Sequence, residues 1–339
     1  MNKRLFRFAA AALFYSGFAI YLYHPYFKGF GTLQLQDIFA VNVTVASLGC
    51  FVLSRRWVAS FWGSLFAGAI YGFGPFVLAL AKFHEMVGLL AAAVPWLFCP
   101  AAFFPRDRRR WLSWPLAVLP FLAILLFFQL SACYSFFPLS INTRLRLADL
   151  AGLLSPLAVA KRNVNTTLVG FYHIPIASLI MGFLMLLTAR RLGILALLAV
   201  STALAFCGSF FDVSPIMWLA VAVLCCSVII GAGMQGFASA GSADRGWILL
   251  PAAAMAALAI VALLLATKYF QFFLGLGDKY ARLLVDAAKI YILGAVAVAI
   301  IFFMARAKLR LHWLRWLILC SATAIDLLWG ARFIVDKIF

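Results

Sequence analysis

The sequence predicts an all-α fold, a polytopic bundle of about 11 transmembrane helices (10–12) that forms one integral membrane domain over residues 1–339. The chain is 66% hydrophobic and only 11% charged, whereas soluble domains are roughly 45–50% apolar and about 25% charged. Its apolar residues form continuous runs, and many reach the roughly 20 residues that a bilayer requires. These runs do not alternate at period two, as barrel strands would. Because backbone groups in lipid must pair internally, the runs must be helices.

The first expected span follows a short basic head that contains Lys3, Arg4 and Arg7. No small-residue cleavage site follows it, so we interpret it as a retained helix and not as a signal peptide. Ten further runs qualify as spans, of which 38–54 is the shortest. The complete set of expected spans is 5–23, 38–54, 57–81, 86–104, 111–131, 168–188, 192–211, 215–237, 246–267, 285–304 and 311–331.

The formal net charge of +18 is best explained by membrane topology. With the N-terminus in the cytoplasm, the inner links receive Arg55–Arg56, the arginines of 106–110 and Arg190–Arg191, while most acidic residues fall outside. Basic residues in short links beside helix ends set orientation and contact anionic lipids at the cytoplasmic face. The prediction is therefore N-terminus inside and C-terminus outside, with no nucleic-acid partner. The low number of charged residues and the basic, uncleaved N-terminal segment favour a bacterial inner (plasma) membrane.

The third and eighth expected spans carry small residues at four-residue spacing. The sets are Ser64, Gly68 and Gly72 in one span, and Ala232, Gly236 and Ala240 in the other. Such spacing makes a smooth helix side that lets two backbones approach closely. We expect both sides to be packing faces, although the spacing does not show which helix each one meets.

The third span also contains a breaker, because Gly74 and Pro75 follow its smooth side. Proline lacks an N–H and clashes with the preceding turn, so the freed carbonyl needs another partner or a cavity. Structural kinking explains most membrane prolines. The alternative is a functional hinge or a discontinuous helix at Gly74 and Pro75.

The longest gap between spans, residues 132–167, is expected on the outer side. It contains a candidate amphipathic helix at about 142–154, whose apolar residues recur at helical spacing, so it would lie on the membrane surface. Five spans precede this loop and six follow. Span counting alone therefore allows a 5+5 inverted arrangement plus one helix, a plan found in many transporters.

Polar residues that could form a site gather on the expected outer side. Asp326 lies inside the last span, roughly one to two turns below its outer end, where a carboxylate needs a partner, water or a proton. If the third span opens at Gly74, a cavity there would collect the site candidates Asn42, His84, Glu85, His173 and Asp326. Histidine and a desolvated carboxylate suit proton exchange or substrate binding. The alternative is that these residues are outside only because the inner side is reserved for basic ones.

No Walker loop, HExxH or GxSxG motif and no CxxC spacing occurs in the chain, so no cofactor or metal site is expected. The kinked spans and the buried carboxylate favour a secondary transporter or carrier of a small or amphipathic solute, with a polar site on the outward side. One alternative is a membrane-embedded enzyme acting on a lipid or a lipid-linked sugar. Another is an accessory subunit that packs on membrane protein partners.

Overall fold

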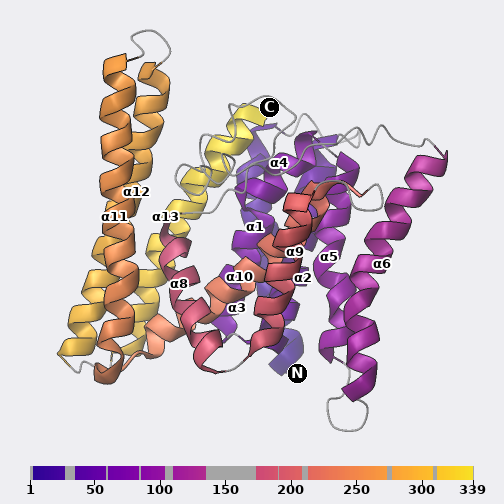
Figure 1. Ribbon diagram of the computed structural model, residues 1–339, viewed down its shortest axis with the longest axis horizontal. Helices are drawn as coiled ribbons and strands as arrows, with labels where there is room; N and C mark the ends of the chain where they lie inside the picture. Colours follow the sequence, from indigo (N-terminus) through magenta and orange to yellow (C-terminus); the bar gives the residue numbers. More distant parts are fainter. Residues whose placement is uncertain are drawn as a thin grey trace.

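A computed structural model describes residues 3–26, 35–58, 60–83, 85–103, 110–134, 173–189, 191–207, 213–272, 277–307 and 311–338. Within these ranges the chain is helical and contains no strand, and Figure 1 shows how the helices are arranged. The α-helices are α1 (Lys3–Tyr23), α2 (Leu35–Trp57), α3 (Phe61–Gly72), α4 (Pro75–Phe83), α5 (Glu85–Phe103), α6 (Arg110–Tyr134), α8 (His173–Thr188), α9 (Leu192–Cys207), α10 (Pro215–Ser239), α11 (Arg245–Phe272), α12 (Gly277–Arg306) and α13 (His312–Ile338).

Seven segments of the described chain are long and apolar enough to cross a membrane. They are Leu5–Tyr26, Ile38–Trp57, Phe61–Leu78, Met217–Ser239, Arg245–Lys268, Ala281–Arg306 and His312–Asp336. Shorter apolar helices lie at Val87–Phe103, Pro115–Leu130, Pro175–Thr188 and Leu192–Cys207, where spans were also expected. The prediction of an all-α, multi-pass membrane protein is confirmed at this level. The number of spans and their orientation stay predictions.

The centre of the bundle is the crossing of α3 and α10. The span window on α10 is 100% buried, and the window that begins with α3 is 89% buried. A Cβ atom added to Gly231 would lie 2.7 Å from the Gly63 carbonyl oxygen, and one added to Gly63 would collide with the Gly231 carbonyl. The two backbones therefore touch where neither helix has a side chain, as in other close membrane crossings.

Each central helix uses a second side to pack on one further helix. The expected face Ser64, Gly68 and Gly72 lies against α2, because Ser54 Oγ donates to Ser64 Oγ at 3.4 Å and a Cβ on Gly68 would lie 2.5 Å from the Ser47 carbonyl oxygen. The second side of α10 packs on α8, against which α10 makes extensive contacts. The order α2–α3–α10–α8 thus forms the core.

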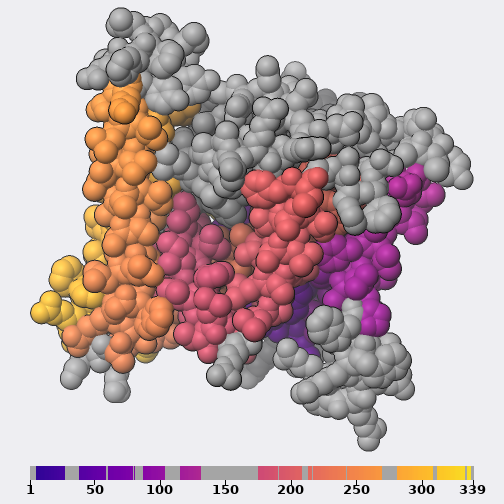
Figure 2. All heavy atoms as spheres, in the orientation of Figure 1, coloured from indigo at the N-terminus to yellow at the C-terminus, as the bar shows by residue number. Residues whose placement is uncertain are grey.

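The remaining helices surround this core. Helix α5 packs on α2 and α6 packs on α5, while α9 covers α10 and α1 lies against α2. Helices α11 and α12 form a hairpin at the left of Figure 1. Figure 2 shows that α8, α9 and α11 make up much of the described surface on this side. Helix α13 runs between these groups and contacts α4, α8, α10 and α12.

Arginines at one end of the bundle bind the carbonyls at which helices end. Arg56 Nε donates to the Ala102 carbonyl in the last turn of α5 at 3.0 Å, and Arg191 Nη1 donates to the carbonyl of Trp57, the last residue of α2, at 2.9 Å. The last four carbonyls of a helix have no partner within the helix, and cations are favourable there. The basic links therefore cap helix C-termini as well as carrying charge.

The same end of the bundle holds the C-terminus of α10. Arg315 donates to the Ala240 carbonyl, and His312 Nδ1 lies 3.1 Å from the Ala238 carbonyl oxygen. Ser60, which caps α3, donates its N–H to Gln235 Oε1 at 2.8 Å. The links expected on one side of the membrane are thus joined to each other by hydrogen bonds.

The packing of the two halves differs. If the second set began at the sixth expected span, α1 and α8 would be equivalent, yet α1 packs mainly on α2 whereas α8 packs mainly on α10. The inverted arrangement therefore stays a prediction without support from helix packing. The expected amphipathic helix at 142–154 lies outside the described residues.

Candidate functional site

The third expected span consists of two helices, α3 and α4, separated at Phe73 and Gly74. The Phe73 N–H donates to the Ala69 carbonyl at 2.9 Å and ends α3, while the Leu78 N–H donates to the Gly74 carbonyl at 3.1 Å and starts α4. Pro75 takes the first position of α4, where no N–H is needed. A Cβ on Gly74 would collide with the Ile70 carbonyl oxygen, so this position requires glycine.

Asp326 lies near the middle of α13, and its side chain is only 1% exposed. The expected span ended at residue 331, but α13 continues to Ile338. Ile334 and Val335 continue its buried face, and Arg332 and Asp336 form an exposed ion pair of 3.7 Å one turn apart. Asp326 is therefore deeper in the helix than the one to two turns expected from the sequence.

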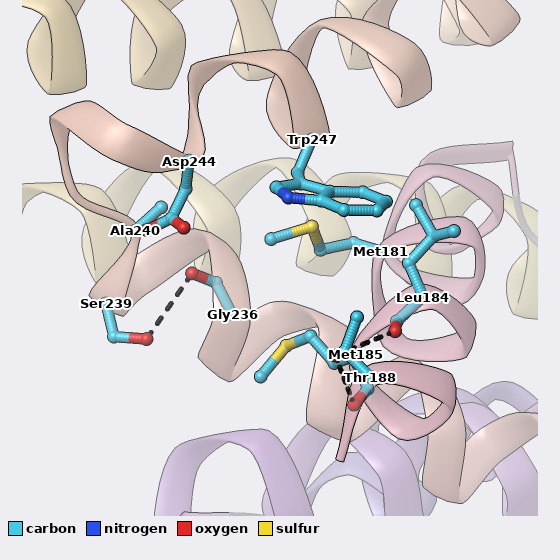
Figure 3. A pocket seen from close by; sticks show the side chains of 9 residues that line it. All are labelled: Met181, Leu184, Met185, Thr188, Gly236, Ser239, Ala240, Asp244 and Trp247. Carbon is cyan, nitrogen blue, oxygen red and sulfur yellow. Dashed lines mark hydrogen bonds between the residues drawn. The ribbon is translucent and has the colours of Figure 1, made fainter. Parts of the chain in front are cut away.

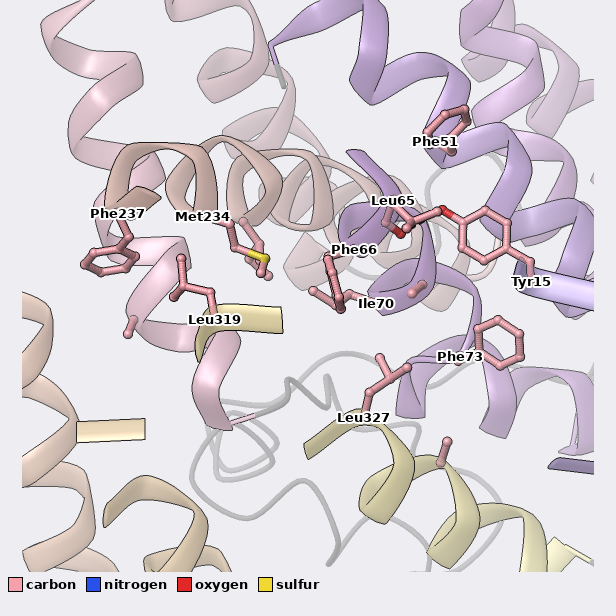
Figure 4. Close-up of a cluster of buried hydrophobic side chains, with 14 of the residues drawn as sticks. Tyr15, Phe51, Leu65, Phe66, Ile70, Phe73, Met234, Phe237, Leu319 and Leu327 are labelled. Carbon is pink, nitrogen blue, oxygen red and sulfur yellow. Dashed lines mark hydrogen bonds between the residues drawn. The ribbon is translucent and has the colours of Figure 1, made fainter. Parts of the chain in front are cut away.

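The surroundings of Asp326 are partly polar. Thr323 precedes it by one turn on the same face and is 2% exposed. Helix α12, which carries the fully buried Tyr291, packs against α13. Leu327, the next residue, belongs to the same buried cluster as Ile70 and Phe73 at the helix break (Figure 4). Asp326 is thus adjacent in α13 to a residue of the cluster that includes the helix break.

Asn42 forms a hydrogen bond between two packed helices. Its side chain is 6% exposed, and its Nδ2 donates to the Gly88 carbonyl oxygen at 3.3 Å. This hydrogen bond joins α2 to α5, a common use of polar side chains between membrane helices. Asn42 therefore has a structural partner near the first turn of α5.

Three of the expected site residues fall outside what the structure describes. His84 lies outside the described residues, and Glu85 and His173 are the first residues of α5 and α8 but their side chains are not described. The common pocket of these residues with Asp326 therefore stays a prediction. In the described part of the chain, His, Cys, Asp and Glu do not gather in groups of three that could hold a metal.

A pocket that the sequence reasoning missed lies at the arginine end, between α8, α10 and the start of α11 (Figure 3). Its volume is about 160 Å³. The small residues of α10 gave a partial signal, since Gly236 and Ala240 of the expected packing face line it. The other lining residues are Met181, Leu184, Met185 and Thr188 of the distant helix α8, and Ser239, Asp244 and Trp247 from the end of α10 to the start of α11.

The described helices form an apolar bundle compatible with a multi-pass membrane protein, with one deeply buried carboxylate on α13 and a separate pocket at the arginine end. Membrane bundles of this kind serve many functions, so the architecture alone does not name a family. Comparison with protein-family models, with curated proteins and with solved structures gives no match to this chain.

Proposed function

We propose that this protein is a secondary carrier of a small or amphipathic solute and that Asp326 is the group that binds the solute or its coupling ion. One observation carries the proposal. The Asp326 side chain is 1% exposed in the middle of α13, and α13 packs on α4, the short half of the broken span.

The free-energy cost of placing the Asp326 carboxylate inside the membrane supports a functional role for this residue. A carboxylate at the centre of a membrane helix costs about 2.5–3.5 kcal/mol on insertion scales. A membrane protein with a purely structural need at this position has apolar alternatives that avoid this cost. A proton, a cation or a solute amine would neutralise the charge, and each of these is an expected cargo or coupling partner of a carrier.

The broken span supplies the second element that a carrier needs. Carriers bind solutes near the midplane, beside helices whose backbone is interrupted. Helix α4 is only nine residues long and is separated from α3 at Phe73 and Gly74. A tilt of α4 about Gly74 and Pro75 would open a path from the end of the bundle opposite the arginines toward Asp326, and its return would close that path.

Orientation in the membrane is part of this proposal. The positive-inside rule places the arginine end in the cytoplasm, with anionic lipids around it, and a bacterial inner membrane fits this arrangement. Alkaline phosphatase fused after residue 339 should be active and a fusion at 190 inactive. The reverse result would invert the bundle and move the opening to the other side of the membrane.

Two alternatives make different demands on the same residues. An enzyme acting on a lipid or a lipid-linked sugar requires at least two of His84, Glu85, His173 and Asp326 to lie within reach of each other. An accessory subunit requires an apolar flank that binds a membrane partner. The α11–α12 hairpin exposes apolar residues such as Ile260, Leu264 and Ile292, which lipid covers as well as a partner would.

Cysteine accessibility tests the carrier without knowledge of its solute. In a background free of native cysteines, Thr323→Cys places a thiol one turn from Asp326, and Ile325→Cys places one on the exposed side of the same helix. Only a hydrated thiol ionises and reacts with a charged thiosulfonate reagent. A carrier should show Thr323→Cys modified from at least one side of the membrane, while Ile325→Cys is not.

A flux measurement completes the test. Vesicles containing the protein are incubated with a mixture of cell metabolites, and mass spectrometry compares their contents with vesicles containing Asp326→Asn. The proposal expects at least one solute whose uptake the substitution abolishes. If Thr323→Cys is unreactive from both sides between pH 5 and pH 9, and no solute distinguishes the two proteins, the carrier proposal is refuted.

A further inference from the structure

The pocket at the arginine end is separate from Asp326 and has its own chemistry. It opens between the last turns of α8 and α10 and the first turn of α11. Arg315, which binds the end of α10 beside it, precedes Asp326 by three turns of α13, or roughly 16 Å along the helix axis. A ligand in this pocket would therefore not touch the carboxylate of the proposed carrier site.

The body of the pocket is apolar and adaptable. Figure 3 shows the indole of Trp247 lying over Met181, with Met185 and Leu184 nearby. Methionine side chains are flexible and polarisable and adjust to ligands of different shape. The volume of about 160 Å³ is close to that of an apolar protein cavity of about 150 Å³ that holds benzene. One ring or a short branched alkyl group fills it.

The polar edge of the pocket consists mainly of acceptors. Ser239 and Thr188 already use their hydroxyl hydrogens, since Ser239 Oγ donates to the Gln235 carbonyl at 2.8 Å and Thr188 Oγ1 donates to the Met185 carbonyl at 3.0 Å. Their oxygens can still accept. Asp244 adds a carboxylate, and the Trp247 indole N–H is the one side-chain donor that the lining residues leave available.

The charged and aromatic groups of the pocket also favour a cation. Asp244 is the only ionisable residue among those that line it. Its Oδ2 accepts the Gly241 N–H at 2.8 Å, and no cation of the described chain lies within ion-pair distance of it. The indole face of Trp247, which is 44% exposed, attracts cations through its π electrons.

We infer that this pocket binds an organic ammonium ion, with the apolar group of the ligand among Met181, Met185 and Trp247 and the ammonium beside Asp244. Two sources could supply this chemistry, a free amphipathic amine from the aqueous side or the ethanolamine headgroup of a lipid. The site goes beyond the proposed carrier function, because it does not require that Asp326 move a solute.

The test titrates benzyltrimethylammonium into the full-length protein in dodecyl maltoside and follows binding by ligand-observed NMR. Asp244→Asn is the main variant, because an asparagine oxygen can still accept the Gly241 N–H and keep the turn. It should weaken binding about fivefold. Trp247→Leu should weaken it about threefold, and Trp247→Phe, which keeps an aromatic face, should weaken it less.

The controls separate the site from general effects of charge. Asp286→Asn removes a carboxylate from the exposed pair with Lys289 on α12 and should leave the affinity unchanged. Because Asp244→Asn and Trp247→Leu change residues of this pocket alone, failure of the carrier proposal and failure of this one are distinguishable. Benzenesulfonate, an aromatic anion of similar size, should not bind.

A second experiment identifies the source of the ammonium. The titration is repeated in phosphatidylglycerol nanodiscs with and without phosphatidylethanolamine. An apparent Kd that rises with the ethanolamine lipid assigns the site to the headgroup, and an unchanged Kd assigns it to a free amine. The inference is overturned if Asp244→Asn and Trp247→Leu both bind the probe as the natural protein does, or if benzenesulfonate binds equally well.

Discussion

The substitution Gly231→Ala should destabilise the bundle, although the same change elsewhere in the chain should stabilise it. A methyl group at Gly231 would lie 2.7 Å from the Gly63 carbonyl oxygen and 3.0 Å from the Ala67 Cβ. Neither group is the end of a flexible side chain, so α3 and α10 must separate. Overpacking of this kind costs about 1–3 kcal/mol.

The matched control is Gly17→Ala in α1, where an added Cβ meets nothing within 4 Å. Alanine at an open helical position is more favourable than glycine by roughly 0.5–1 kcal/mol. The free energy of unfolding is measured for both variants in mixed micelles of dodecyl maltoside and SDS. The two variants should differ by at least about 1.5 kcal/mol in opposite directions. Equal stability of the two would show that α3 and α10 do not meet at these glycines.

Three further predictions use the same unfolding measurement. Tyr15→Phe removes a buried hydroxyl that donates to the Leu65 carbonyl at 2.7 Å (Figure 4) and should cost about 0.5–1.5 kcal/mol; no loss would mean that water satisfies this carbonyl. Asn42→Ala breaks the bond to Gly88 and should cost about 0.6–1.7 kcal/mol, unless α2 and α5 do not pack there. Arg315→Gln should cost about 1–1.5 kcal/mol, because a charge-assisted cap of α10 becomes a neutral one; an unchanged stability would contradict that cap.

The helix break and the helical class were readable from the sequence because they depend on local chemistry. Pro75 has no N–H, and Gly74 precedes it, so the sequence offered a kink or a discontinuous helix there. The structure has two helices at this point, whereas α5 continues through Pro95 and Pro100. The end of α13 was less readable. The expected span stopped at residue 331, whereas Arg332 and Asp336 form an ion pair one turn apart on a helix whose other face stays buried.

The sequence did not show which helix each packing face contacts. Residue spacing identified Ser64, Gly68 and Gly72 as a packing face but could not assign it to α2, since any smooth neighbour satisfies the same pattern. The contact between α3 and α10 uses Gly63 and Gly231, which lie outside the two expected faces. The pocket was hidden for a related reason, because two segments far apart in the chain, 181–188 and 236–247, contribute its walls.

The arginines that cap the helix C-termini connect membrane insertion with helix packing, two processes that are usually treated separately. A basic link that crossed the membrane the wrong way would break the charge rule and would also leave Ala102, Trp57 or Ala240 with an unbonded carbonyl. Lysine at Arg191 would preserve the sign of that link but lose the planar fork that reaches Trp57. Membrane insertion and the stability of the folded bundle can therefore be separated at this one position. The variant with lysine there should insert in the correct orientation, but its folded bundle should be less stable.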